Sequence, residues 1–229
     1  MINRLSKLSK ISKVSSFNEP LRFNSSLPIS IEVLKELPLN RYKLLLGNRE
    51  FTTKSKKKLK AKERYWGDFS NTKDGVILIS NLVKKPTFLQ KETNFLDFEF
   101  EFLFNKLKKT YFKDWILDGL EGSSKIEFKI FATMLLALKN GVIHLPLKVE
   151  NELCLIQLKE NKFYMAQHNL GPICGVFENK KLKIDILFQK SFYFLKESLK
   201  GSELQIDFNL KESISPIFEK DTSILDIKG

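Results

Sequence analysis

The sequence predicts an α+β protein with a small β-barrel-like N-terminal module, a helical connector, and a C-terminal mixed β-sheet domain with one short packed helix. Two observations predict this class. Short runs of alternating apolar and polar residues, the period of a half-buried strand, occur on both sides of the middle of the chain. In the middle, apolar residues recur at helical spacing instead. The chain has 229 residues, of which 42% are hydrophobic, so it can bury a substantial core.

Residues 1–37 are predicted to form a basic flexible N-terminal segment. Apolar residues recur at every third position from Ile2 to Val14, with Lys or Arg between them. This segment fits a solvated terminus, an export signal, a membrane-surface contact or a nucleic-acid arm, and the residues do not choose among these. Residues 1–64 contain 16 Lys or Arg and 5 Asp or Glu, whereas the rest of the chain contains 23 and 22. Any electrostatic partner is therefore expected to meet the first third of the chain.

The composition favours a reduced cytoplasmic protein. The chain holds two Cys, which form no disulfide framework. Its longest apolar run, Phe131 to Leu138, is too short for a transmembrane segment. The stretch from Met1 to Ser16 lacks the uninterrupted apolar core of a cleavable secretory signal.

Residues 38–87 are predicted to form the small β module. Arg41–Leu46 and Glu50–Thr53 are expected to be strands joined by a tight turn at Gly47 and Asn48. Further short strands are expected as far as Leu82, and several short strands in so few residues indicate a small, strongly curved barrel.

A run of cations in this module is the candidate nucleic-acid-binding site. Cations contact phosphates and aromatic faces stack on bases, so the two together favour single-stranded nucleic acid. The alternative is a solvated loop whose neighbouring aromatic residues lie in the core. Tyr65 and Trp66 are adjacent, so only one can face the core of the module, and the other must be exposed or covered by a neighbouring element. The candidate residues are Lys54, Lys56, Lys57, Lys58, Lys60, Lys62, Arg64, Tyr65 and Trp66.

Residues 88–140 are predicted to be a helical connector of two helices. The start of the first helix is ambiguous, because Phe98 to Phe104 alternates like a strand. The second helix has clear ends, since Ser124 and Glu127 form a capping box and Asn140 with Gly141 forms a stop signal.

Residues 141–215 are predicted to form the C-terminal α+β domain, followed by a loosely attached tail at 216–229. A helix is expected at Phe192–Leu199, since its apolar residues recur at helical spacing. Strands are expected over residues 142–147, 153–158, 163–168, 173–177, 182–188 and 204–210.

The chain is expected to have no enzymatic activity and no cofactor. It contains no phosphate-binding loop, nucleophile elbow or metalloprotease helix, and no catalytic constellation. Its soft metal ligands lack the close pairs that are typical of zinc sites, so no metal site is expected. These ligands are His144, Cys154, His168 and Cys174.

One part of the C-terminal domain carries a family resemblance. Asn169, Leu170 and Gly171 form a turn ahead of an apolar strand, and a hairpin, an alternating strand, a helix and a closing strand follow as far as Leu210. In this order of elements, residues 163–210 resemble the C-terminal domain of bacterial flagellar hook-length control proteins. Members of that family usually carry a Pro/Gln-rich ruler ahead of this domain, whereas this sequence has only 7 Pro, scattered singly.

The resemblance implies a non-enzymatic protein of flagellar assembly or type III export. Its C-terminal domain would contact the flagellar export gate or other flagellar proteins, and its N-terminus would be an uncleaved export signal. The expected partner-binding residues are Leu170, Gly171, Phe192, Leu195 and Leu199. The alternative hypothesis is a single-stranded nucleic-acid-binding protein that uses the basic run at residues 54–64.

Overall fold

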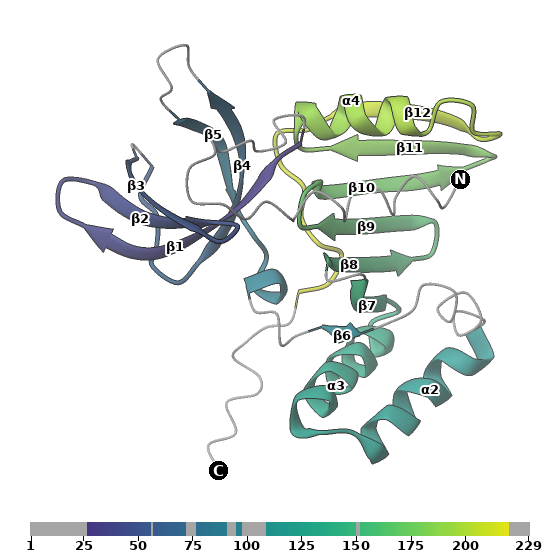
Figure 1. The fold of residues 1–229 in the computed structure, drawn as a ribbon. Helices are drawn as coiled ribbons and strands as arrows, with labels where there is room; N and C mark the ends of the chain where they lie inside the picture. Colours follow the sequence, from purple (N-terminus) through teal and green to yellow (C-terminus); the bar gives the residue numbers. More distant parts are fainter. Residues whose placement is uncertain are drawn as a thin grey trace.

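The computed structural model describes residues 27–55, 57–71, 77–90, 95–97, 109–149 and 152–219. These ranges contain two β-sheets and three α-helices, which confirms the predicted α+β class and its C-terminal mixed sheet (Figure 1). The smaller, N-terminal sheet lies beside the larger, C-terminal one. A helical hairpin lies at one end of the larger sheet, and a single helix lies at the other end.

The N-terminal sheet is antiparallel throughout, with the strand order β3-β2-β1-β4-β5. One face buries a core that includes Tyr42, Tyr65 and Phe69. Register shifts in β1 and β4 mark bulges, which increase the local twist of a sheet. The strands are β1 (Ile29–Leu37), β2 (Arg41–Leu46), β3 (Arg49–Lys54), β4 (Arg64–Asn71) and β5 (Ile77–Lys84).

Strand β1 differs from the sequence expectation, which placed it in the flexible N-terminal segment. It is the central strand of the sheet and pairs with both β2 and β4. Ile29, Ile31 and Val33 alternate into the core, but this alternation is short and stops at the bulge that follows Val33. The N-terminal module therefore begins ahead of residue 38.

The connector contains two neighbouring helices, α2 (Lys109–Gly122) and α3 (Lys125–Lys139), after a short 3-10 turn η3 (Thr87–Gln90) and strand β6 (Leu96–Asp97). The predicted ends of α3 are confirmed: Ser124 and Glu127 form the capping box, and Asn140 is the C-cap. The alternating Phe98 to Phe104 stretch lies outside the described residues.

The C-terminal sheet has the strand order β12-β11-β10-β9-β8-β7-β6. The two end pairs, β11 with β12 and β6 with β7, are parallel, and the other pairs are antiparallel. Helix α4 (Gln189–Ser198) makes the crossover from β11 to β12. The remaining strands are β7 (Ile143–Val149), β8 (Glu152–Lys159), β9 (Lys162–Gln167), β10 (Gly171–Glu178), β11 (Lys181–Ile186) and β12 (Gln205–Leu210).

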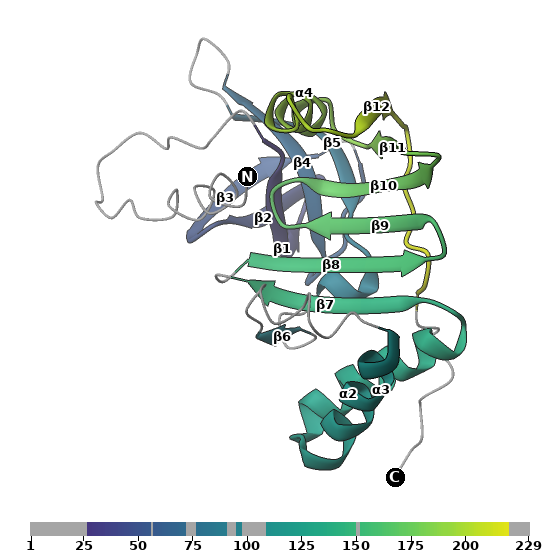
Figure 2. The same cartoon turned by 90° about the vertical axis from the view of Figure 1, so that its right-hand side faces the viewer.

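The two faces of the C-terminal sheet have different coverings. On one face, α3 packs against β7 and α4 packs against β11 and β12, so the helices lie at opposite ends of the sheet (Figure 2). The other face packs against Trp66 and Leu89 of the N-terminal half. Trp66 also donates from Nε1 to the carbonyl oxygens of Gln167 and His168 at 3.2 and 3.1 Å, which ties the two sheets together.

The segment after Pro216 is attached more firmly than the sequence predicted. The Gln157 side chain, which is buried in β8, accepts from the backbone N–H groups of Ile217 and Phe218 at 2.7 and 3.1 Å. The same side chain donates to the carbonyl oxygen of Phe218 at 2.6 Å. An amide side chain thus holds residues 217–218 as a neighbouring strand would. Residues 220–229 lie outside the described part of the chain.

Candidate protein-binding surface

The free end of the C-terminal sheet carries a shallow groove between α4 and β12. Its volume is about 440 Å³, and it is lined by Phe192 and Lys196 of α4, by Ile206–Asn209 of β12 and by Lys183 of β11. We call these residues, together with the flanking Leu204 and Leu210, the α4–β12 surface. The lining combines the apolar Phe192, Ile206 and Phe208 with the polar or charged Lys183, Lys196, Asp207 and Asn209, a mixture that is typical of protein-binding surfaces.

Helix α4 is held in place by the turn that precedes β10. The Ser191 hydroxyl donates to the carbonyl oxygen of Leu170 at 2.7 Å. Gly171 has a φ of +73°, and a Cβ atom at this position would lie 2.6 Å from the ring of Phe188, the N-cap residue of α4. A side chain here would therefore meet both backbone strain and a clash.

The five expected partner-binding residues divide into two groups. Leu170 and Gly171 are buried, so they position α4 and do not themselves present a surface. Phe192, Leu195 and Leu199 are half-buried and, like Ile206 and Phe208 of β12, pack against the buried core cluster of this end of the sheet. Of these three, Phe192 also lines the groove, where its ring meets that of Phe208 at a centroid distance of 6.1 Å.

Two exposed apolar residues of this surface were not among the partner-binding residues expected from the sequence. Leu204 and Leu210 are 45% and 48% exposed, at the two ends of the strand that terminates the sheet. The alternation around Phe208 correctly predicted a strand. It could not show that the strand lies at an edge, because edge position depends on pairing and not on the local pattern.

The charges beside the groove are largely paired. Lys183 donates to Glu178 at 2.7 Å, and this hydrogen bond raises the pKa of Lys183. Asn209 donates to Asp185 at 3.1 Å, and Lys211 lies 4.0 Å from the same carboxylate. The Lys196 ammonium lies 5.8 Å from the centroid of the Phe192 ring. Lys183 is thus paired, whereas Lys196 and Asp207 add charge to the lining of the groove.

The basic run at residues 54–64 has a different geometry from a stacking platform. Tyr65 faces the core of the N-terminal sheet, and Trp66, on the opposite face, is covered by the C-terminal sheet. Of the two outcomes expected for the second ring, exposure or cover by a neighbouring element, the structure shows cover. Both are almost fully buried, so neither ring offers a face to a base.

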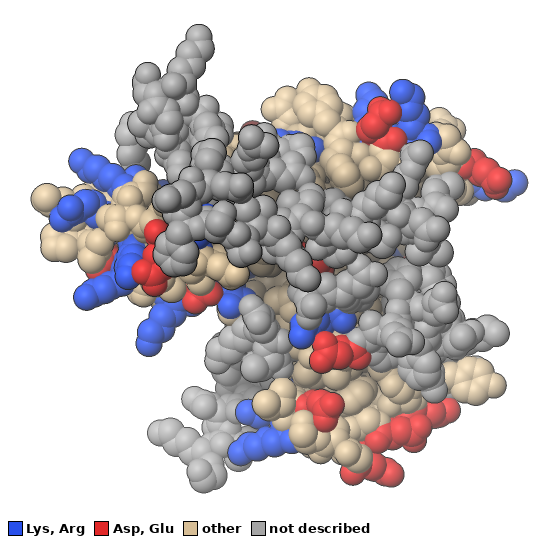
Figure 3. Space-filling view, in the orientation of Figure 1, with Lys and Arg blue, Asp and Glu red and all other residues tan. Residues whose placement is uncertain are grey.

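The cations of this run remain accessible for the most part. Lys54, Lys57, Lys58, Lys60 and Lys62 are exposed, and Lys56 lies outside the described residues. Figure 3 shows Lys and Arg on this part of the molecule with Asp and Glu interspersed.

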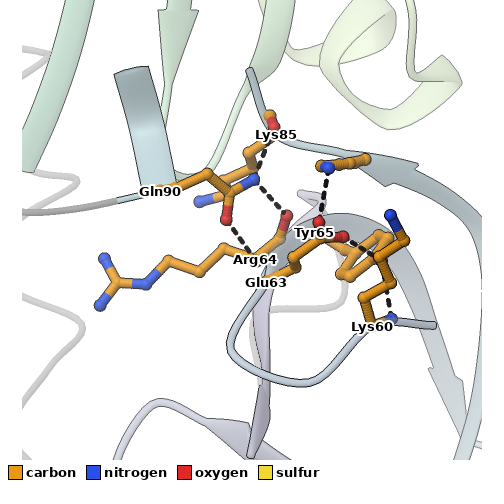
Figure 4. Close-up of polar contacts among 7 residues, drawn as sticks. Lys60, Glu63, Arg64, Tyr65, Lys85 and Gln90 are labelled. Carbon is orange, nitrogen blue, oxygen red and sulfur yellow. Dashed lines mark hydrogen bonds and ion pairs between the residues drawn. The ribbon is translucent and has the colours of Figure 1, made fainter. Parts of the chain in front are cut away.

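Arg64 serves the structure of the β module. Its side-chain Nε lies 3.0 Å from Glu32, and its backbone N–H donates to Gln90 at 2.6 Å. Figure 4 shows Gln90 reaching back to the carbonyl oxygens of Arg64 and Lys85, and the Tyr65 hydroxyl contacting Glu63 and Lys60. These bonds fix the end of the basic run, where the chain enters β4, and the segment of residues 85–90 that follows β5.

The four soft metal ligands do not come together. His144 and Cys174 share a row on one face of the sheet, but they are three strands apart, which is about 14 Å. Cys154 points to the other face, and burial raises the pKa of its thiol to about 12. Burial lowers the pKa of His168 to about 3. Within the described residues, no group of three or more His, Cys, Asp or Glu is arranged to hold a metal ion.

Comparison with known proteins finds no family model, no curated protein and no solved structure that matches this chain. The relation to hook-length control proteins that the sequence suggested therefore stays an expectation. Among the helices in the described ranges, none is both long enough and apolar enough to cross a lipid bilayer.

Proposed function

We propose that this chain is a non-enzymatic protein of bacterial flagellar assembly or type III export, which acts by binding other proteins through the α4–β12 surface. The observation that supports protein binding is the groove at the end of the C-terminal sheet, which Phe192 and Phe208 line, together with the exposed Leu204 and Leu210 at the two ends of β12. Large exposed apolar side chains gathered at one site mark interaction surfaces.

The flagellar setting is supported by the resemblance of residues 163–210. The elements of that stretch follow in the order that the resemblance implies: β9, the turn at Leu170 and Gly171, β10, β11, α4 and β12. The partner in this proposal is the flagellar export gate or another flagellar protein.

The proposal is tested by deleting the gene in the source organism and measuring hook lengths by electron microscopy. The expected result is overlong or unterminated hooks, with normal length restored by the gene supplied in trans. Hooks of normal length in the deletion strain would contradict the flagellar part of the proposal, as would a source organism that builds no flagella.

A second candidate function is nucleic-acid binding by the N-terminal module, and one observation favours it. Five lysines, at positions 54, 57, 58, 60 and 62, are exposed in one short segment. Because the neighbouring aromatic rings are buried, such binding would depend on phosphate contacts alone and would weaken steeply with salt.

This second candidate is tested with a fluorescently labelled single-stranded oligothymidine and a salt titration. Replacing Lys57, Lys58 and Lys60 by Ala should weaken binding and flatten the salt dependence. The matched control replaces the exposed Lys159 and Lys162, at the ends of β8 and β9, and the exposed Lys180, in the turn between β10 and β11. Equal loss in both triple variants would show general charge attraction and contradict a site at the basic run.

A further inference from the structure

Strand β12 lies at an edge of the C-terminal sheet and lacks the features that usually prevent an edge strand from pairing with another chain. Natural edge strands are short, contain Lys or Pro, or are covered, because exposed backbone N–H and C=O groups invite pairing. The six residues of β12 contain no Pro, no Lys and no Arg, and Asp207 is their one charged residue. Among the described residues, nothing pairs with its outer edge. By contrast, the opposite edge of the same sheet is β6, which has two residues.

We propose that β12 pairs with β12 of a second copy of this chain, antiparallel, about a two-fold axis that passes between the two Phe208 residues. The pairing would join the two C-terminal sheets into one continuous sheet. This inference rests on the proposed function, since it names a second copy as one occupant of the α4–β12 surface.

The residues of β12 are self-complementary in this register. Directly opposite residues on antiparallel strands point to the same face. Phe208 would lie opposite Phe208 of the second copy, and Ile206 opposite Leu210, so the exposed Leu210 side chains become covered. On the other face, Asp207 would lie opposite Asn209, and Gln205 opposite Lys211.

Charge repulsion disfavours the alternative register, in which the two-fold axis passes between the two Asp207 residues. In that register apolar residues would again lie opposite apolar residues, but the two Asp207 carboxylates would lie directly opposite each other. Like charges at directly opposed positions destabilise a strand pair. Long-range repulsion is small in either case, because residues beyond 64 carry 23 Lys or Arg and 22 Asp or Glu, although the whole chain is strongly basic.

The helices fit the same arrangement. Helix α4 packs over β11 and β12, and neighbouring strands are about 4.8 Å apart. Two copies of α4 would therefore lie about 10 Å apart, which is the usual distance between packed helices. Phe192, which contacts Phe208, would lie near the axis. Lys196 is one turn further along α4, so its two copies would lie on opposite sides of the axis.

The test is analytical ultracentrifugation of the full chain over protein concentrations from about 1 to 100 μM, the range that resolves micromolar association. A monomer–dimer equilibrium is expected. Leu210→Lys should raise the dissociation constant of the dimer at least about tenfold, because each dimer loses two apolar contacts. Tyr111→Lys, at a residue of α2 that is 59% exposed, is the matched control and should leave it unchanged. A monomer at every concentration, or a dimer insensitive to Leu210→Lys, would overturn the proposal.

A second pair of variants tests the register. Gln205→Glu places a carboxylate opposite Lys211 of the second copy and should strengthen association, whereas Gln205→Lys should weaken it, each by about threefold. Equal affinities for the two variants would overturn this register. These results are separable from the flagellar proposal: a monomeric protein whose deletion still lengthens hooks would reject the dimer and keep the function.

Discussion

The Ser191 hydroxyl donates a hydrogen bond of 2.7 Å to the carbonyl oxygen of Leu170, and both residues are buried. The bond ties the first turn of α4 to the turn that precedes β10. It connects two parts of the chain that the family resemblance groups as one candidate site.

Replacing Ser191 by Ala should leave the Leu170 carbonyl oxygen without this partner. The expected loss is about 1–3 kcal/mol in the free energy of unfolding, the usual cost of an unsatisfied buried group. Denaturant melts measure it. Ser213→Ala, at an exposed serine, is the control and should change little. Equal stability of the two variants would show that the bond does not hold α4.

Gly171→Ala should destabilise the protein for two separable reasons. The residue has a φ of +73°, and its new Cβ would lie 2.6 Å from the Phe188 ring. Gly141 has the same φ of +73°, but a Cβ at that position would have no neighbouring atom within 4 Å, so Gly141→Ala reports backbone strain alone. We expect about 1 kcal/mol for Gly141→Ala and about 2–4 kcal/mol for Gly171→Ala. Similar losses in both would contradict the close packing of Phe188.

Gln157→Ala should release the C-terminal segment from the sheet. The Gln157 side chain accepts from the backbone N–H groups of Ile217 and Phe218 and donates to the carbonyl oxygen of Phe218. Its Nε2 also lies 3.0 Å from Nδ1 of His144. Amide hydrogen exchange at Ile217 and Phe218 should rise by at least about tenfold, while β9 and β10 stay protected. Gln189→Ala, at an exposed glutamine on α4, is the control. Unchanged exchange in the Gln157 variant would rule out the clamp.

The buried His144 predicts a loss of stability at acid pH. Burial lowers its pKa to about 4, whereas an unfolded His titrates at about 6.5. Between these values the unfolded chain binds the proton and the folded one does not. Stability is therefore fully present above pH 6.5 and falls by about 3 kcal/mol as the pH drops toward 4.

Unfolding free energies measured from pH 7.5 to 5 check this prediction. His144→Phe should reduce the slope by about half, because burial also lowers the pKa of His168, to about 3, and the two residues contribute about equally in this pH range. The variant is expected to be less stable at every pH, since Gln157 loses an acceptor. An identical slope in the wild type and the variant would contradict a neutral buried His144.

Several elements could be predicted because the residues that determine them are close together in the sequence. The capping box at Ser124 and Glu127 needs four residues, and the alternation at Leu182–Ile186 needs five. The tight turn at Gly47 and Asn48 likewise follows from two residues, and β2 and β3 pair across it as expected.

The features that sequence reasoning missed depend on distant partners. Strand β1 looked like a terminus because its partners, β2 and β4, supply the pairing that makes it central. Gln157 carries no local sign that it binds residues 60 positions away. The burial of Trp66 follows from a second sheet that packs against the first, with bonds to residues 101 and 102 positions later.

If the α4–β12 surface binds the partner, changes on this surface should abolish complementation of a deletion strain. Hook lengths are measured in cells that supply Leu204→Lys with Leu210→Lys, or Tyr111→Lys with Ile126→Lys on the α2–α3 hairpin, all four residues being exposed. Equal melting temperatures of the two purified variants confirm that both fold. We expect overlong hooks with the first variant and normal hooks with the second. Normal hooks with the first variant would contradict partner binding by this surface.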